Sequence, residues 1–308
     1  MYAKSIDQTM KGQFFIHIGL PKTATTFLQW NVFPRIENVE FLGKAKQVDF
    51  YDVYNSPHDK FLISHEHLLA CPSKRYPNGW LDEFGSRLAK LARRFPSAKI
   101  MLSFRAHEAL LTSYYKEYIS KPGRPYLTLD QFFDVHNNQG FVRHEDLIFS
   151  DLIEMVERHF DEKPFVYLFD DVVRRLPVFL TDLAVFLGER TPDASTVQRD
   201  KVNPGVGYYQ AKILVKLNQF DAVLQRVPFV PGLYNPVFKR LSIQPDRLCR
   251  KNLAFLSTRP LSLTEEQRDF VATHYQEDWK NVEAYVVRQR SERELANGAR
   301  ERGKLTTG

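Results

Sequence analysis

Apolar and polar residues alternate in blocks along the first 190 residues of the chain. Short apolar runs predict buried strands, because a strand covered on both faces of a sheet has no polar side. These runs are Gln13–Ile18, Phe61–Ser64, Ile100–Phe104 and Phe165–Phe169. Longer segments with apolar residues at helical spacing follow them, at Thr25–Phe33, Trp80–Phe95, Glu108–Ile119, Asp146–Phe160 and Val178–Leu187.

This alternation predicts an α/β fold, because strands that alternate with helices form a parallel sheet with helices on both faces. After Glu189 the strand patterns fade. Val206–Leu224 is typical of a helix, and a capping box at Thr264 opens a long final helical pattern. Pro228–Pro245 is rich in proline and aromatic residues and is typical of an irregular segment. The C-terminal part is therefore predicted to be mostly helical.

The chain has 308 residues, 43% of them hydrophobic and 26% charged, which is ordinary for a globular protein with a real core. Chains often split into domains beyond ~250–300 residues. Because no linker, repeat or low-complexity stretch divides this sequence, we predict one domain over residues 1–287. Residues 288–308 hold six basic residues against three acidic ones, half of the net charge of +6. They are predicted to form a basic, solvated or disordered tail.

The modest positive charge fits an anionic ligand but gives no evidence for a nucleic-acid partner, and none is predicted. The two cysteines, Cys71 and Cys249, fit no metal or redox motif and are typical of a reducing compartment. No early apolar run resembles a secretion signal, and no segment approaches the ~20 apolar residues of a membrane span. We therefore expect a soluble cytoplasmic protein without an integral membrane segment. The sequence leaves the oligomeric state open.

The turn after the first strand carries the first candidate chemistry. In FFIHIGLPKTATTFLQW the strand ends at Gly19 and the helical pattern starts at Thr25. A Walker A loop, G-x-x-x-x-G-K-[ST], has the same outline: its backbone N–H groups cradle phosphates and its lysine reaches the β- and γ-phosphates. Here Ala24 occupies the second glycine position and Thr25 replaces the lysine. The loop is P-loop-type, but it does not suit a nucleoside triphosphate with Mg²⁺.

The altered loop suits a ligand with one phosphate-like group in the cradle and a reactive bond above it. The hydroxyls of Thr23, Thr25 and Thr26 can donate to phosphate oxygens. Lys22, at the crown of the loop, can supply positive charge where a leaving group develops negative charge. The alternative is a plain strand–turn–helix in which the threonines only cap the helix.

A second cluster follows the third strand, in KIMLSFRAHEALLTSYYKEY. Arg105 ends this strand at the carboxyl edge of the sheet, where doubly wound folds bind ligands. Ser113 follows on the next helix. An arginine and a serine placed in this way can hold a second phosphate, the arginine with two parallel hydrogen bonds. The alternative is a surface ion pair for Arg105 and an ordinary helix position for Ser113.

Taken together, Phe14–Gln29 and Ile100–Tyr114 resemble the 5′-phosphosulfate loop and the 3′-phosphate motif of sulfotransferases that use PAPS (3′-phosphoadenosine 5′-phosphosulfate). The form PKTATTFLQ is most similar to the bacterial branch, which is itself similar to the carbohydrate (heparan-type) enzymes. The usual glycine of PK-x-G-TT is Ala24 here, which changes how closely the backbone can approach the phosphate. The resemblance covers roughly the first 190 residues and fades afterwards.

The resemblance implies transfer of the sulfuryl group of PAPS to an acceptor hydroxyl, on a saccharide, a glycolipid or another small molecule. The product 3′,5′-adenosine bisphosphate leaves, and no metal is required. Lys22 is implied to stabilise the bridging oxygen. The implied donor-binding residues are Gly19, Pro21, Lys22, Thr23, Ala24, Thr25 and Thr26 for the 5′ side and Arg105 and Ser113 for the 3′-phosphate.

The catalytic base is expected at the end of the second strand, LISHEHLL. Glu66 is the base that the resemblance to heparan-type enzymes implies. Its neighbours His65 and His67 are the alternatives, because the ordinary pKa of histidine is nearer neutrality. Family members often close the site with a later basic loop, for which Arg199 and Lys201 are candidates.

Two other functions compete with sulfuryl transfer. The first is a P-loop kinase or nucleotide triphosphatase, in which Asp170 and Asp171 would hold the metal after the fourth strand. This alternative lacks the Walker A lysine. The second is a nucleotide-binding relative that kept the fold and lost activity, and it would bind the donor without turnover.

Overall fold

The structure is a computed structural model that describes residues 12–43, 56–65, 68–70, 76, 79–120, 127–198, 207–224 and 259–305. The chain divides into two compact units. One comprises residues 1–105, 148–198 and 277–308, and the other comprises residues 106–147 and 199–276. The single domain over residues 1–287 stays a prediction.

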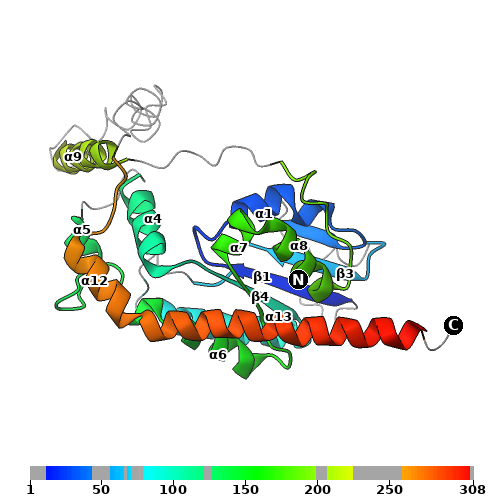
Figure 1. The fold of residues 1–308 in the computed structure, drawn as a ribbon. Coiled ribbons are helices and arrows are strands. Elements are labelled where there is room, and N and C mark those ends of the chain that lie inside the picture. The colour runs from blue at the N-terminus through cyan, green and yellow to red at the C-terminus, as the bar shows by residue number, and fades with distance from the viewer. Residues whose placement is uncertain are drawn as a thin grey trace, which may run out of the picture. The chain divides into compact units, whose positions relative to one another are not determined.

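The first unit is built on a five-stranded, all-parallel sheet with the strand order β2-β3-β1-β4-β5 (Figure 1). Its strands are β1 (Gln13–Gly19), β2 (Glu40–Gly43), β3 (Lys60–Ser64), β4 (Lys99–Phe104) and β5 (Phe165–Leu168). The predicted α/β fold with a parallel sheet is confirmed. The sequence pattern missed β2, because this short edge strand is mostly half-buried and has no continuous apolar run.

The helices of this unit are α1 (Thr25–Asn31), α3 (Trp80–Arg94), α6 (Phe149–His159), α7 (Phe169–Arg174), α8 (Leu176–Leu187), α13 (Gln276–Leu305, in this unit from residue 277) and the short 3₁₀ helix η1 (Phe33–Arg35). The helix predicted over Thr25–Phe33 ends early, at Asn31, because Pro34 cannot continue an α-helix and lies in the separate 3₁₀ helix η1. The helix predicted over Val178–Leu187 starts two residues earlier, at Leu176, because Pro177 is tolerated within the first turn of α8.

Helices cover both faces of the sheet, as predicted. On one face, apolar residues of the strands pack in one core with α1, α7 and α8, which lie together on the same side in Figure 1. These strand residues are Phe15, Leu62, Met101 and Phe165. On the other face, the ring of Phe14 packs against Phe95 at the end of α3, and Phe104 stacks on Phe149 of α6.

The long helix α13 closes the edge of the sheet at β5. The side-chain amide of Gln289 accepts a hydrogen bond from the N–H of Val166 (3.1 Å) and donates one to its carbonyl. The amide thus satisfies an outer-edge backbone pair that would otherwise lack a strand partner. Arg290 pairs with the buried carboxylate of Asp171 at 2.8 Å. The helix continues from these contacts to Leu305. The basic, solvated or disordered tail from residue 288 stays a prediction.

The second unit contains α4 (His107–Ser120), α5 (Leu129–Phe132), the 3₁₀ helix η2 (Glu145–Leu147), α9 (Tyr208–Leu224) and α12 (Glu265–His274). The capping box of Thr264 and Gln267 is confirmed. The predicted long final helix is two helices, because α12 ends at His274, Tyr275 caps it, and α13 begins at Gln276. The expected irregular segment Pro228–Pro245 lies outside the described residues.

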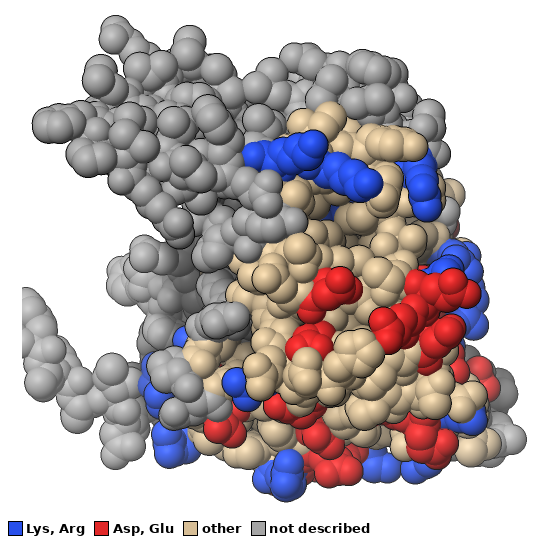
Figure 2. All heavy atoms as spheres, turned by 90° about the vertical axis from the view of Figure 1, so that its left-hand side faces the viewer, with Lys and Arg blue, Asp and Glu red and all other residues tan. Residues whose placement is uncertain are grey.

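Figure 2 shows one face of the molecule, on which acidic side chains gather near the middle and lysines and arginines lie mainly towards the margins. This face therefore carries mixed charge among the described residues. None of the helices in the described ranges is both long enough and apolar enough to cross a membrane.

Candidate functional site

The loop between β1 and α1 contains two strained residues. Lys22 and Ala24 have φ values of 69° and 68°, in the left-handed region that residues with a Cβ rarely adopt. Strain of this kind is concentrated at functional sites. The beginning of the loop is also closely packed: a Cβ on Gly19 would lie 2.5 Å from Oγ1 of Thr25. The first glycine of the motif is therefore needed because of space, and the position of Ala24 is one where glycine would be unstrained.

The three threonines of the loop differ in their surroundings. Thr23 is fully buried, and its hydroxyl donates to the carbonyl of Leu20 at 2.6 Å and contacts the hydroxyl of Ser103 at 2.6 Å. Thr25 is also buried, with a long hydrogen bond of 3.5 Å to the same carbonyl. Thr26 is exposed. The hydroxyl of Thr23 thus supports the loop from inside, whereas Thr26 faces solvent.

Arg105 lies beside the crown of this loop. Its Nη1 donates to the carbonyl of Lys22 at 3.2 Å, and its guanidinium lies 4.1 Å from the ring centroid of Phe169 at the start of α7. Partial burial lowers the pKa of Arg105, and the nearby charge of Asp170 opposes this shift. An arginine remains charged even so. The ends of β1 and β4 therefore bring Lys22 and Arg105 to the same edge of the sheet.

Asp170 and Asp171, the two acids after β5, differ from each other in burial and in their partners. Asp171 is fully buried, and its carboxylate pairs with Arg175 at 2.5 Å and Arg290 at 2.8 Å. It also accepts a hydrogen bond from the N–H of Leu168. Asp170 pairs with Arg174 at 3.6 Å on the surface. A carboxylate with two arginine partners is a structural anchor, so Asp171 does not suit the metal-holding role of a nucleotide triphosphatase.

The remaining candidates fall in different places. Ser113 is half-buried on α4 in the second unit, so its partnership with Arg105 stays a prediction. His65 follows β3 directly at the carboxyl edge. The other candidates, Glu66, His67, Arg199 and Lys201, lie outside the described residues.

The sequence analysis missed a buried polar layer beneath the loop. His17, Ser64, Ser103 and Tyr167 come from four neighbouring strands, and all are at most 1% exposed. His17 contacts Ser64 through Nδ1 and Tyr167 through Nε2, both at 2.7 Å. Burial lowers the pKa of His17 to about 3 and raises that of Tyr167, so both side chains are neutral at pH 7. In the sequence, the signal that could have predicted this layer was a single polar residue near the end of each of these apolar strands.

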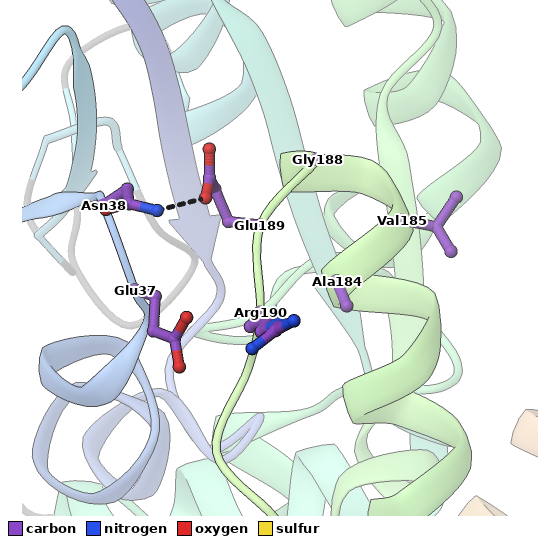
Figure 3. Close-up of a pocket in the computed structure, with 7 residues that line it drawn as sticks. All are labelled: Glu37, Asn38, Ala184, Val185, Gly188, Glu189 and Arg190. Carbon is purple, nitrogen blue, oxygen red and sulfur yellow. Dashed lines mark hydrogen bonds between the residues drawn. The ribbon is translucent and has the colours of Figure 1, made fainter.

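The hollow shown in Figure 3 lies elsewhere, at the amino ends of β2 and β3. It is lined by Glu37, Asn38, Ala184, Val185, Gly188, Glu189 and Arg190. Asn38 donates to Glu189 at 3.0 Å, and Glu189 also pairs with Lys60, the first residue of β3. None of the predicted site residues lines this hollow.

In the part of the chain that the structure describes, no group of three or more His, Cys, Asp or Glu side chains is placed to hold a metal ion. No protein-family model and no curated protein matches the sequence. Among solved structures, mouse sulfotransferase SULT7A1 complexed with PAP is similar, with 14% sequence identity and a TM-score of 0.38. The match covers 60% of this chain and 61% of that one, so it spans less than two thirds of either.

Proposed function

We propose that this chain is a sulfotransferase that moves the sulfuryl group of PAPS to an acceptor hydroxyl. The observation that carries the proposal is the hydrogen bond from Arg105 to the carbonyl of Lys22. The two motifs were identified separately in the sequence, more than 80 residues apart, and the side chain of Arg105 from the second contacts the backbone of Lys22 in the first. A donor with phosphates at both the 5′ and the 3′ position needs two anion sites on one edge.

The loop residues fit the 5′ side of such a donor. The carboxyl ends of parallel strands are the usual ligand edge of an α/β sheet. Backbone N–H groups of the loop, with the exposed hydroxyl of Thr26, would hold the 5′-phosphate, and Thr25 would act mainly through its backbone because its side chain is buried. Arg105, with Ser113, would hold the 3′-phosphate. Gly19, Pro21, Thr23 and Ala24 would shape the loop around the donor.

In the proposed reaction the acceptor oxygen attacks sulfur in line. A new oxygen–sulfur bond forms, the bond from sulfur to the bridging phosphate oxygen breaks, and adenosine bisphosphate leaves. The exposed ammonium of Lys22 would stabilise the charge that develops on the bridging oxygen. The acceptor proton passes to a base, for which Glu66 is proposed, with His65 or His67 as alternatives. Positioning and charge stabilisation supply most of the rate in such transfers.

The finer parts of the proposal rest on the sequence alone. The PKTATTFLQ form favours the bacterial branch and a saccharide or glycolipid hydroxyl as the acceptor. The two isolated cysteines favour the cytoplasm. Arg199 and Lys201 are proposed to close over the donor.

Calorimetric titration without metal tests the donor site. We expect the chain to bind 3′,5′-adenosine bisphosphate in the absence of Mg²⁺ and not to bind ATP with Mg²⁺. Arg105→Ala should weaken bisphosphate binding at least tenfold. Arg174→Ala is the matched control, because it removes the same charge from the surface of α7 near this edge. ATP–Mg²⁺ binding, or equal losses in the two variants, would contradict the proposal.

Turnover separates an enzyme from a binding relative. With a panel of saccharide, glycolipid and small-alcohol acceptors, release of bisphosphate from PAPS should depend on one acceptor class and on Lys22. Tight bisphosphate binding with no acceptor-dependent release from any class would favour the non-catalytic relative.

A further inference from the structure

Two successive layers of side chains cross the same face of the sheet. The lower layer is apolar and consists of Phe15, Leu62, Met101 and Phe165. The upper layer is polar and consists of His17, Ser64, Ser103 and Tyr167. Each of these residues comes two positions after the apolar residue of its own strand, nearer the carboxyl end. Ser103 lies level with Gly19 across the β1–β4 pair, whereas His17 lies level with Met101. The polar residues therefore run diagonally across the sheet and reach the start of the loop at Ser103.

Hydrogen bonds, with one further interaction between Tyr167 and Ser103, connect these side chains in a series. Gln29 of α1 contacts the hydroxyl of Ser64 at 2.9 Å, and His17 bridges Ser64 and Tyr167 at 2.7 Å on each side. Tyr167 lies level with Ser103 on β4, and the side chains of these two residues interact. From there the chain continues from Ser103 to Thr23 and from Thr23 to Leu20, both at 2.6 Å.

The end of the hydrogen-bond chain at Leu20 determines the direction in which its members donate. The carbonyl of Leu20 can only accept, so the hydroxyl hydrogen of Thr23 is donated there. Ser103 must then donate to Thr23, so the oxygen of Ser103 can only accept from the hydroxyl of Tyr167. The oxygen of Tyr167 is left to accept from Nε2–H of His17.

The near end gives the same direction independently. The side-chain nitrogen of Gln29 also donates to the backbone carbonyl of Ser64 at 3.1 Å, which fixes the orientation of this amide. The amide nitrogen therefore donates to the hydroxyl of Ser64 as well. Ser64 in turn donates to Nδ1 of His17. Both ends therefore favour a neutral His17 with its single proton on Nε2, because this tautomer gives the hydroxyl hydrogens of Ser64 and Tyr167 each an acceptor.

We propose that this one-way hydrogen-bond chain holds the β1–α1 loop in its donor-binding conformation, with His17 as a positioning residue that keeps the chain in one direction. The loop needs such support, because Lys22 and Ala24 are in the left-handed region. The hydrogen-bond chain ends on Thr23, which lies between these two strained positions, and on Leu20, two residues before the first of them. The proposal deepens the proposed sulfotransferase function and rests on it for the identity of the ligand.

The tautomer of His17 tests the direction of the hydrogen-bond chain. In ¹⁵N spectra of the ligand-free protein at pH 7, His17 should be neutral and protonated on Nε2. His17→Gln, which keeps one donor and one acceptor without a titratable ring, assigns the signal. A signal from the Nδ1–H tautomer or from a charged ring would overturn the proposal.

Tyr167→Phe tests whether the chain positions the loop. It removes one hydroxyl, leaves Nε2–H of His17 without its acceptor, and keeps the ring that packs against Phe179. Tyr275→Phe is the matched control. Its tyrosine is equally buried, and its hydroxyl donates to the carbonyl of His144 in the second unit at 2.9 Å.

Amide hydrogen exchange and bisphosphate titration give the readouts. Tyr167→Phe should speed exchange at Lys22–Leu28 at least tenfold and weaken bisphosphate binding about tenfold, whereas Tyr275→Phe should change neither. Equal effects in the two variants, or no effect in Tyr167→Phe, would overturn the positioning role. If the wild-type protein binds no bisphosphate, the proposed function fails, but the exchange and tautomer results still decide the hydrogen-bond chain.

Discussion

The two ends of the sheet carry charge in different ways. At the amino ends of β2 and β3, Lys60 pairs with Glu189 beside an open hollow, and Asn38 donates to the same carboxylate (Figure 3). At the carboxyl ends, Lys22 and Arg105 lie together above a buried polar layer, on a backbone that is partly strained.

The difference teaches that a hollow is weaker evidence of a ligand site than the surroundings of the charges. At the amino end, the carboxylate of Glu189 has both a cation and an amide as partners. Asn38 there has φ of 55°, but asparagine adopts the left-handed region more readily than lysine or alanine does. At the carboxyl end, the fold buries polar groups and holds two residues in a costly conformation. Costs of this kind persist when the surrounding structure fixes them, and they are concentrated at functional sites.

Removal of a lysine from each end should give the largest difference. Lys22→Ala should lower kcat for sulfuryl transfer from PAPS by about 10²–10³-fold, because a charge that stabilises the leaving oxygen is lost. Lys60→Ala should leave kcat unchanged, since its partner is Glu189 at the other end. Steady-state rates at saturating PAPS measure both. A loss of rate in Lys60→Ala comparable to that in Lys22→Ala would break the distinction.

Gly19→Ala should destabilise the protein by up to about 3 kcal/mol through overpacking. The new Cβ would lie 2.5 Å from Oγ1 of Thr25 and 2.9 Å from Cε1 of His17. Gly85→Ala is the control, because nothing lies within 4 Å of a Cβ there and alanine favours the helix α3. Chemical denaturation should show loss of stability in the first variant and a small gain in the second. Equal stability of the two variants would show that the loop is not closely packed.

The pH dependence of stability should also differ between the ends. Burial lowers the pKa of His17 to about 3, below its unfolded value near 6.5, so its stabilisation is complete above pH 6.5 and is lost as the pH falls. The loss by pH 5 is about 2 kcal/mol. Hydrogen bonds from Lys60 and Asn38 lower the pKa of Glu189, so its stabilisation is lost only below about pH 4.5.

The variant His17→Gln isolates the first of these effects, because the lowered pKa of His274 acts in the same pH range. Denaturation midpoints between pH 7 and pH 5 should fall less steeply in this variant than in the wild-type protein. Identical slopes would mean that His17 is not held neutral by the fold.

The smallest effect should come from two positions in the left-handed region. Ala24→Gly should be neutral or stabilising by up to about 1 kcal/mol, because glycine relieves φ of 68° but adds freedom to the unfolded chain. Gly188→Ala, at φ of 66° beside the hollow, should be destabilising by about 1 kcal/mol. Thermal unfolding measures both. Destabilisation by Ala24→Gly beyond about 1 kcal/mol would show that the loop depends on the methyl group.

The sequence predicted four of the five strands, because each is a continuous apolar run. It missed β2, whose register with β3 depends on tertiary pairing rather than on its own pattern. It also missed His17, because a polar residue in a buried strand is informative only when its partners on other strands are known. The middle of α13 depends in the same way on distant groups, because Gln289 and Arg290 contact the edge of β5 at Val166 and the carboxylate of Asp171.

The proximity of Lys22 and Arg105 could be expected from the rule that parallel strands end at one sheet edge. The roles of the threonines could not, because the sequence does not show which hydroxyls turn inward. The structure distinguishes Thr23, whose hydroxyl is bonded within the fold, from the exposed Thr26.

Hydrogen exchange with and without 3′,5′-adenosine bisphosphate tests most directly which end of the sheet binds the donor. The account predicts that the bisphosphate slows exchange at Gly19–Leu28 and Arg105 and leaves the segments 37–38 and 184–190 unchanged. Protection of 37–38 and 184–190 with none at Gly19–Leu28 would contradict the assignment of the donor site to the carboxyl end.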